Sequence, residues 1–251
     1  DSRDVNYDVG SLEKNDLKNY RKMAQLIFQD PYAALSPRMT VRDIIAEPLE
    51  VMGLTQTREE TDERVREMAA KCRLNLEHLR RFPHAFSGGQ RQRISIARTL
   101  VCNPDFVVAD ESVAALDVSI QADILNLLKS LQDEMGLTFL FISHDLSVVA
   151  HICDHVAVMY LGSLVESAPT RKLFANPSHP YTKALLSAIP SLDPDDSGKA
   201  QKLEGEIPSP VNPPPGCKFH TRCPVAEDRC RTEVPDWREL SDGHSVACHL
   251  A

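Results

Sequence analysis

Residues 104–112 read PDFVVADES, an apolar run that ends in two adjacent carboxylates, Asp110 and Glu111. A short run of apolar residues bounded by proline and by charge indicates a buried strand. Three similar runs, separated by segments with helical periodicity, lie at residues 23–28, 137–143 and 155–161. We therefore expect an α/β fold in which all four runs are buried strands of one mostly parallel sheet.

Helical patterns fill the intervals between these runs. Residues 40–54, 57–72 and 75–82 predict helices, and together with the segment that follows they form a helical subdomain over about residues 40–100, inserted into the sheet-bearing domain. A further amphipathic helix begins after Asp117 and ends at Gly136. Its apolar face is made by Ile120, Ile124, Leu127, Leu128, Leu131 and Met135.

Length and charge limit the possible functions. The 251 residues suffice for one main domain, residues 1–190, and a smaller extension, residues 191–251, whose first part is rich in Pro, Asp, Ser and Gly and predicts an extended connector. A net charge of −8 argues against binding to the phosphate backbone of nucleic acids. No apolar run reaches the roughly 20 residues that a membrane-spanning helix requires.

Residues 86–100, FSGGQRQRISIARTL, place a Ser-Gly-Gly turn before a helix. Backbone N–H groups at a helix N-terminus attract phosphate, so Ser87, Gly88 and Gly89 are a candidate phosphate cradle. The alternative is a capped helix after a flexible turn. At the end of the strand at 106–110, Asp110 could hold Mg²⁺ and Glu111 could polarise an attacking water; the alternative is a solvated turn.

Two more polar residues follow predicted strands. His144 could contact a γ-phosphate, and the amide of Gln29 could bind a metal or a water; alternatively, each is an ordinary residue at a strand end. Because the carboxyl ends of parallel strands and the following helix starts meet at one edge of a sheet, we expect these groups to lie together there.

Five short motifs resemble those of ATP-binding cassette (ABC) proteins, and they follow the family's order. These are FQDP at 28–31 (Q-loop), FSGGQRQR at 86–93 (signature), FVVADE at 106–111 (Walker B), ALD at 115–117 (D-loop) and ISHD at 142–145 (switch histidine). The longer phrases FQDPYAALSPRMTVRDIIAEPL and DVSIQADILNLL are similar to one branch, the ATPase subunits of dipeptide and oligopeptide importers.

The resemblance implies an ATPase that uses Mg²⁺ and closes head to tail with a second ATPase subunit, identical or related. It implies that Glu111 and His144 act in catalysis and that Asp110 and Gln29 hold the metal. Nucleotide contacts would come from Gln29, Ser87, Gly88, Gly89, Gln90, Asp110 and Asp117. Arg91, Arg93 and Arg98 need not all touch nucleotide, and we expect salt bridges around the helical subdomain for the last two.

The same resemblance implies partners and a location. The Q-loop and the helical subdomain would bind a short helix of a permease, of which two subunits lie in the membrane. An extracytoplasmic binding protein would deliver the peptide. The chain would then lie peripherally on the cytoplasmic side of the inner membrane. Cargo specificity, whether for dipeptide, oligopeptide, metal or opine, would reside in the other subunits.

One family motif is absent. A P-loop requires Gly-x4-Gly-Lys-Ser/Thr, whereas the only Gly-Lys here, Gly198-Lys199, is followed by Ala200. We therefore expect an N-terminally truncated chain that hydrolyses little ATP by itself. Smaller departures from the branch are Phe86, Ser112 and Ala114, where Leu, Pro and Ser are usual.

Two other functions fit some of these motifs. A DNA repair or chromosome-maintenance ATPase shares the signature and Walker B, but it usually inserts a long coiled coil that has no counterpart between Gln29 and Ser87. A non-catalytic fragment or regulatory partner would fit the absent P-loop.

Four of the seven cysteines, Cys217, Cys223, Cys230 and Cys248, lie near the C-terminus, with spacing unlike that of a zinc ribbon. The run PPPGCKFHTRCPVAEDRC is similar to the C-terminal extension of peptide-importer ATPases, which can carry a four-iron, four-sulfur (4Fe-4S) cluster. The alternatives are zinc, with His220 as a further ligand, and free thiols. Elsewhere, we expect Cys72, Cys102 and Cys153 to be buried free thiols.

Overall fold

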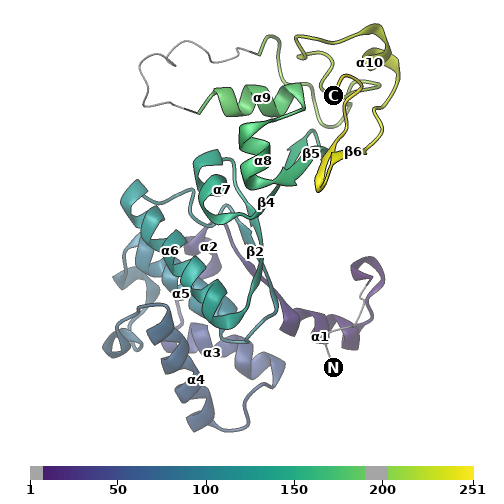
Figure 1. Cartoon of the computed structure of the whole chain (residues 1–251). Coiled ribbons are helices and arrows are strands. Elements are labelled where there is room, and N and C mark those ends of the chain that lie inside the picture. The colour runs from purple at the N-terminus through teal and green to yellow at the C-terminus, as the bar shows by residue number, and fades with distance from the viewer. Residues whose placement is uncertain (1–7, 190–202) are drawn as a thin grey trace. The chain divides into compact units, whose positions relative to one another are not determined.

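The computed structural model describes residues 8–189 and 203–251 (Figure 1). The chain divides into two units, Asp1–His144 and Asp145–Ala251, which are considered separately. The α-helices of the first unit are α1 (Lys14–Met23), α2 (Pro31–Ala34), α3 (Val41–Met52), α4 (Arg58–Lys71), α5 (Gly88–Leu100) and α6 (Val118–Met135). Its strands are β1 (Ala24–Ile27), β2 (Phe106–Asp110) and β3 (Thr138–Ile142), and its 3-10 turns are η1 (Val9–Ser11), η2 (Leu76–His78) and η3 (Pro83–Ala85).

The first unit contains the predicted parallel sheet, with strand order β1-β2-β3. Ile27, Ala109 and Phe141 lie side by side in adjacent strands. The strands expected at 23–28, 106–110 and 137–143 are therefore confirmed, with β1 and β3 slightly shorter than predicted. Because all three strands run the same way, their carboxyl ends, and the residues that follow, lie at one edge.

The expectation that all of these strands are buried is wrong for β3, and it fails in part for β1 and for the run at 155–161, where Leu26 is 38% and Met159 60% exposed. Helix α5 packs against β1 and α6 packs against α5, and on one face of the sheet Ile27, Val107 and Ala109 are fully buried. On the other face Leu140 and Ile142 are 49% and 44% exposed. Side chains alternate between the two faces of a strand, so β3 is apolar on both sides although one of its faces stays exposed.

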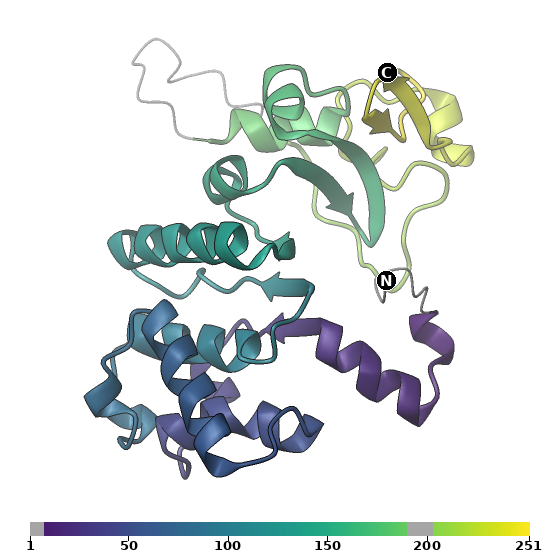
Figure 2. The ribbon, with the colours of Figure 1, turned by 60° about the horizontal axis from the view of Figure 1, so that its bottom comes forward.

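The helical subdomain is formed by α3, α4 and α5, which pack against one another (Figure 2). The side chains of Thr40, Thr57 and Ser87 cap the N-termini of these helices by accepting a backbone N–H. The predicted helix at 75–82 is wrong, because only the 3-10 turn η2 forms there. Helix α6 has the predicted bounds, with Gly136 at φ +66° as its C-cap.

The second unit contains a separate antiparallel sheet with strand order β4-β5-β7-β6. Its strands are β4 (His155–Tyr160), β5 (Ser163–Pro169), β6 (Arg238–Ser241) and β7 (His244–Val246), and its helices are α7 (Leu146–Ile152), α8 (Thr170–Ala175), α9 (Pro180–Ser187) and α10 (Asp228–Thr232). The predicted strand at 155–161 is therefore real but was assigned to the wrong sheet. Leu161 and Gly162, both at positive φ, turn the chain back into an antiparallel hairpin.

The C-terminal residues are part of this second unit. Strand β7 pairs with β5, and the fully buried ring of Phe219 packs against Tyr160 and Tyr181. Residues 203–216 contain no helix or strand, as expected of the connector, while its segment 190–202 lies outside the described residues. The domain boundary predicted at residue 190 stays a prediction.

Candidate functional site

Glu111 follows the last residue of β2, and its backbone is in the left-handed region at φ +42°. A non-glycine residue there is strained, and such strain accumulates at functional sites. The conformation is held from the neighbouring strand, because the N–H of Glu111 donates to the carbonyl of Ile142 at 3.0 Å. The strained turn therefore fixes the direction in which the Glu111 side chain leaves the sheet edge.

Two predicted site residues, which follow the carboxyl ends of the two strands that flank β2, hold the Glu111 carboxylate. Gln29, two residues past β1, donates its amide N–H to Oε2 at 2.5 Å. His144, two residues past β3, places Nδ1 at 2.9 Å from Oε1. The Glu111 side chain remains 27% exposed and that of His144 72% exposed. Three residues separated widely in sequence thus form one cluster that solvent, and therefore a ligand, can reach.

Asp110 is the last residue of β2, opposite Ile142 of β3, and is half-buried. Because Gln29 uses its amide nitrogen on Glu111, its amide oxygen is left for another partner. A carboxylate and an amide oxygen are hard ligands of the kind that Mg²⁺ binds. The donor set at this edge therefore fits the magnesium ion that the motifs imply.

The Ser-Gly-Gly turn forms a second group of predicted site residues. Ser87 and Gln90 make a reciprocal capping box at the start of α5, and among the residues described Ser87 has only these side-chain hydrogen bonds. A Cβ at Gly89 would lie 2.5 Å from Cγ2 of Ile120, so glycine is required for α5 to approach α6. The alternative of a capped helix is thus realised structurally, with Ser87 exposed, Gly88 half-buried and Gly89 buried.

Asp117 lies beside this turn rather than at the edge that carries Glu111. It precedes α6 as an exposed N-cap whose side chain accepts no capping hydrogen bond. Its neighbours Leu116 and Ile120 approach Gly88 and Gly89. The structure thus arranges the predicted residues in two groups: one with Gln29, Asp110, Glu111 and His144, and one with the turn at 87–90 and Asp117.

The three arginines of α5 have different partners. Arg98 forms the expected ion pair, with Glu47 of α3 at 2.9 Å, whereas Arg93 donates instead to the carbonyl of Cys72. Arg91 lies over the ring of Tyr32, with Cζ 3.9 Å from the ring centroid. The contact between Arg91 and Tyr32 was not predicted, because no sequence pattern indicates a contact between residues 59 positions apart.

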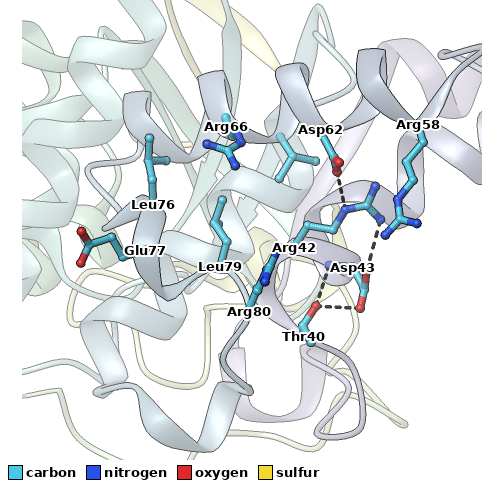
Figure 3. A pocket seen from close by; sticks show the side chains of 11 residues that line it. Thr40, Arg42, Asp43, Arg58, Asp62, Arg66, Leu76, Glu77, Leu79 and Arg80 are labelled. Carbon is cyan, nitrogen blue, oxygen red and sulfur yellow. Dashed lines mark hydrogen bonds and ion pairs between the residues drawn. The ribbon is translucent and has the colours of Figure 1, made fainter.

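A pocket of about 610 Å³ lies in the helical subdomain (Figure 3). Arg42 is fixed within it by Asp62 at 2.7 Å and Asp43 at 3.2 Å. The other lining residues are Thr40, Arg58, Val65, Arg66, Leu76, Glu77, Leu79 and Arg80. No ion pair is formed by Arg58, Arg66 or Arg80 within the described residues, and these arginines share the lining with the carboxylate of Glu77 and with Leu76, which is 40% exposed.

The four C-terminal cysteines lie near one another. The N–H of Cys217 donates to the carbonyl of Cys230 at 2.9 Å. Burial raises the pKa of the Cys217 and Cys223 thiols, and repulsion from the neighbouring cysteines raises it further. In residues 8–189 and 203–251, however, no three His, Cys, Asp or Glu side chains are arranged to hold a metal. Four thiols are the type of ligand that a thiolate-bound cluster uses, but the described positions do not place three of them as ligands of one metal.

Cys72 and Cys102 are buried as expected, and burial raises the pKa of these thiols to about 12 and about 11. Cys153 is only half-buried.

No helix of the described ranges is long and apolar enough to cross a membrane.

Comparison with solved structures identifies the class of fold. The chain is similar to cbiO1 of Clostridium perfringens, part of the ABC transporter complex cbiONQ, with a TM-score of 0.60 and 26% identity over 66% of this chain and 64% of that one. It is also similar to a dimeric ATP-binding cassette bound to ADP and Pi in a post-hydrolysis state, with a TM-score of 0.56 and 29% identity over 64% and 69% of the two chains. The fold is that of an ABC ATPase.

Comparison of sequences identifies the branch. The chain is 55% identical to a protein of Brucella ovis described as a peptide import ATP-binding protein, over 96% of this chain and 76% of the relative. It is 52% identical to the oligopeptide transport ATP-binding protein AppF of Bacillus subtilis, over 97% and 74%. Residues 1–114 match the model of the ABC transporter family, and residues 165–230 match that of the C-terminal region of oligopeptide/dipeptide transporters. The chain belongs to the ATP-binding subunits of oligopeptide/dipeptide ABC importers.

Proposed function

We propose that this chain supplies the hydrolytic residues of an ATPase that drives uptake of di- or oligopeptides through a membrane permease. The observation that carries the proposal is the Gln29–Glu111–His144 cluster, in which a strained carboxylate is held by two side chains at the edge of the sheet. Glu111 would accept a proton from the attacking water, and His144 would orient Glu111 while contacting the γ-phosphate.

Asp110 and the Gln29 amide oxygen would hold Mg²⁺, which neutralises charge on the phosphates when bound. The turn at Ser87–Gly89 would donate backbone N–H groups to a γ-phosphate bound by a second ATPase subunit. Among the described residues no hydrogen bond joins this turn to the Gln29–Glu111–His144 cluster, which supports the role, since the two groups would then serve two different nucleotides. Whether the second subunit is another copy or a related chain depends on surfaces of both.

Glu111→Gln tests the hydrolytic role, since it keeps the shape of the side chain and removes the base. We expect ATP turnover to fall by at least about 100-fold in the complete gene product, including any residues that precede Asp1. Asp133→Asn removes an exposed carboxylate of α6 in the same unit and should leave turnover unchanged. Undiminished phosphate release by Glu111→Gln would refute the proposal.

The chain by itself should hydrolyse little ATP, since its sequence contains no Gly-x4-Gly-Lys-Ser/Thr. Supplying a P-loop-bearing segment at the N-terminus should restore turnover. Substantial hydrolysis by the unextended 251 residues would show that nucleotide is bound in another way.

The pocket of the helical subdomain is the proposed docking surface for the permease, on the cytoplasmic face of the inner membrane. Arg66 and Arg80 would meet carboxylates of a short permease helix, while Leu76, 40% exposed, would meet its apolar side. Reversing both arginines to Glu should reduce co-purification with the permease. Arg171→Glu, an exposed charge in α8 of the second unit, should not.

We also propose a 4Fe-4S cluster on Cys217, Cys223, Cys230 and Cys248, supported by the proximity of four thiols. Binding would release protons from thiols whose pKa is raised, so affinity should increase with pH. Iron and acid-labile sulfide should be found in protein purified without oxygen, and both should be lost in Cys230→Ser. Zinc without sulfide, or no metal at all, would contradict the cluster.

A further inference from the structure

Arg91 is the only arginine of α5 that reaches toward the loop carrying Gln29. Its guanidinium donates from Nε to the carbonyl of Pro83 at 2.8 Å and from Nη2 to that of His84 at 3.4 Å. Both carbonyls belong to η3, the turn that leads into Ser87. One face of the same guanidinium covers the ring of Tyr32, at 3.9 Å from the centroid.

Tyr32 is linked to the Glu111 cluster through Gln29 and the start of α2. It lies three residues after Gln29, in α2, whose N-terminus is capped by Asp30 accepting the Tyr32 N–H at 2.7 Å. Pro31 is buried between them, and α2 packs against α5. A short capped helix after a fixed proline leaves little freedom, so movement of Gln29 should be passed on to the Tyr32 ring.

We propose that Tyr32 and Arg91 form a positioning pair that ties the Gln29 loop to the Ser87–Gly89 turn within one chain. When Gln29 shifts between Glu111 and a bound metal or phosphate, the pair adjusts the turn that the chain presents to its partner's nucleotide. The pair therefore couples the two nucleotide sites of the dimer. This inference rests on the proposed function, because it requires that the turn serve the opposite site.

The Tyr32 ring contributes to this linkage through the cation–π contact of its face with Arg91, and not through burial of the ring. Tyr32 is 63% exposed, so removing its ring should alter global stability little. A cation–π contact at an exposed site corresponds to about a two- to fivefold change in an equilibrium constant. The effect should therefore appear in the ATP concentration that closes the dimer, and much less in the chemical step.

The test uses the complete gene product assembled with its permease, with the KM for ATP, kcat, Hill coefficient and melting temperature measured. We expect Tyr32→Leu and Arg91→Met each to raise KM about two- to fivefold and to lower the Hill coefficient, with kcat within about twofold of the parent. Tyr32→Phe keeps the ring face and should behave like the parent. The double variant should be no worse than Arg91→Met alone, because Arg91→Met already removes the contact that Tyr32→Leu removes.

Arg98→Met is the matched control, since it removes an arginine of the same helix that binds Glu47 rather than Tyr32. It should change the melting temperature without changing KM. Unchanged KM in Tyr32→Leu, an equal defect in Tyr32→Phe, or additive effects in the double variant would each overturn the positioning pair. The Glu111→Gln variant is measured alongside these variants. If Glu111→Gln abolishes turnover, the outcomes above test only the positioning pair; if turnover survives Glu111→Gln, the proposed function itself is rejected.

Discussion

Each unit of the chain contains a glutamate hydrogen-bonded to a histidine, in opposite surroundings. Glu111 meets His144 at 2.9 Å, with both side chains reachable by solvent. Glu166 meets His244 at 2.8 Å, with Glu166 fully buried and accepting two further bonds from the N–H groups of Ser178 and His179. The same pair of residue types can therefore serve a reaction at an open sheet edge or hold strands together inside a core.

The buried pair should dominate stability. Glu166→Ala would leave His244 and two backbone N–H groups without partners, and we expect the second unit to lose about 3–5 kcal/mol. Urea unfolding followed by the fluorescence of Trp237, the only tryptophan, measures this. Glu111→Ala is the matched control and should change stability by less than about 1 kcal/mol, because its partners remain solvated. If Glu166→Ala and Glu111→Ala lose the same free energy of unfolding, the proposed difference between the buried and the exposed pair is contradicted.

A second difference between the units should appear with pH. Burial lowers the pKa of His179 to about 4, and its Nδ1 accepts the N–H of Tyr181 as the N-cap of α9. Between pH 6.5 and about 4 the unfolded chain binds a proton that the folded one excludes, so stability should fall as pH decreases, by at most about 3 kcal/mol. His179→Asn keeps a capping oxygen and should remove most of the loss of stability between pH 6.5 and about 4. If this variant loses as much stability over that range as the parent does, the loss comes from other groups.

Close packing of α5 against α6 gives the first unit its own sensitive position. A Cβ at Gly89 would lie 2.5 Å from Ile120, whereas one at Gly88 would make an ordinary 3.7 Å contact with Leu116. Gly89→Ala should therefore cost about 1–3 kcal/mol. Gly88→Ala should be neutral or stabilising, because alanine favours the helix. Circular dichroism of thermal unfolding tests both, and similar melting temperatures would contradict the packing.

The smallest expected effect concerns the residue after Glu111. Ser112 is 2% exposed, and its hydroxyl finds no hydrogen-bond partner among residues 8–189 and 203–251. Removing an unsatisfied buried hydroxyl should stabilise the first unit by about 1 kcal/mol in Ser112→Ala. Ser130→Ala, which alters an exposed hydroxyl on α6, should be close to neutral. A loss of stability in Ser112→Ala would mean that the hydroxyl is satisfied in solution.

The first unit was largely predictable because its signals are local. The apolar run at 106–110, the helical spacing from Ile120 to Met135 and the stop at Gly136 each specify an element without reference to the rest of the chain. Charged residues at strand ends also indicated the cluster of Glu111. The sequence did not reveal that Gln29 and His144 both contact that carboxylate, because such distances depend on sheet register.

The second unit was predicted less well because its structure depends on pairing across long intervals. The run at 155–161 has the composition of a parallel strand, yet the Leu161–Gly162 turn makes it half of a hairpin. The contribution of β7 to the same sheet could not be seen from three residues near the C-terminus. In the first unit, helix α1 was also missed, since it is largely polar and none of its described side chains is buried.

The pairing of β7 with β5 has a practical consequence for gene products that end early. A nonsense change at Leu240 would delete the strand bonded to Glu166 and Ser167, along with His244. The hairpin would then expose unpaired peptide groups along one side, which invites self-association. Such shortened proteins should accumulate as insoluble aggregates, even though every residue assigned to the nucleotide would still be present.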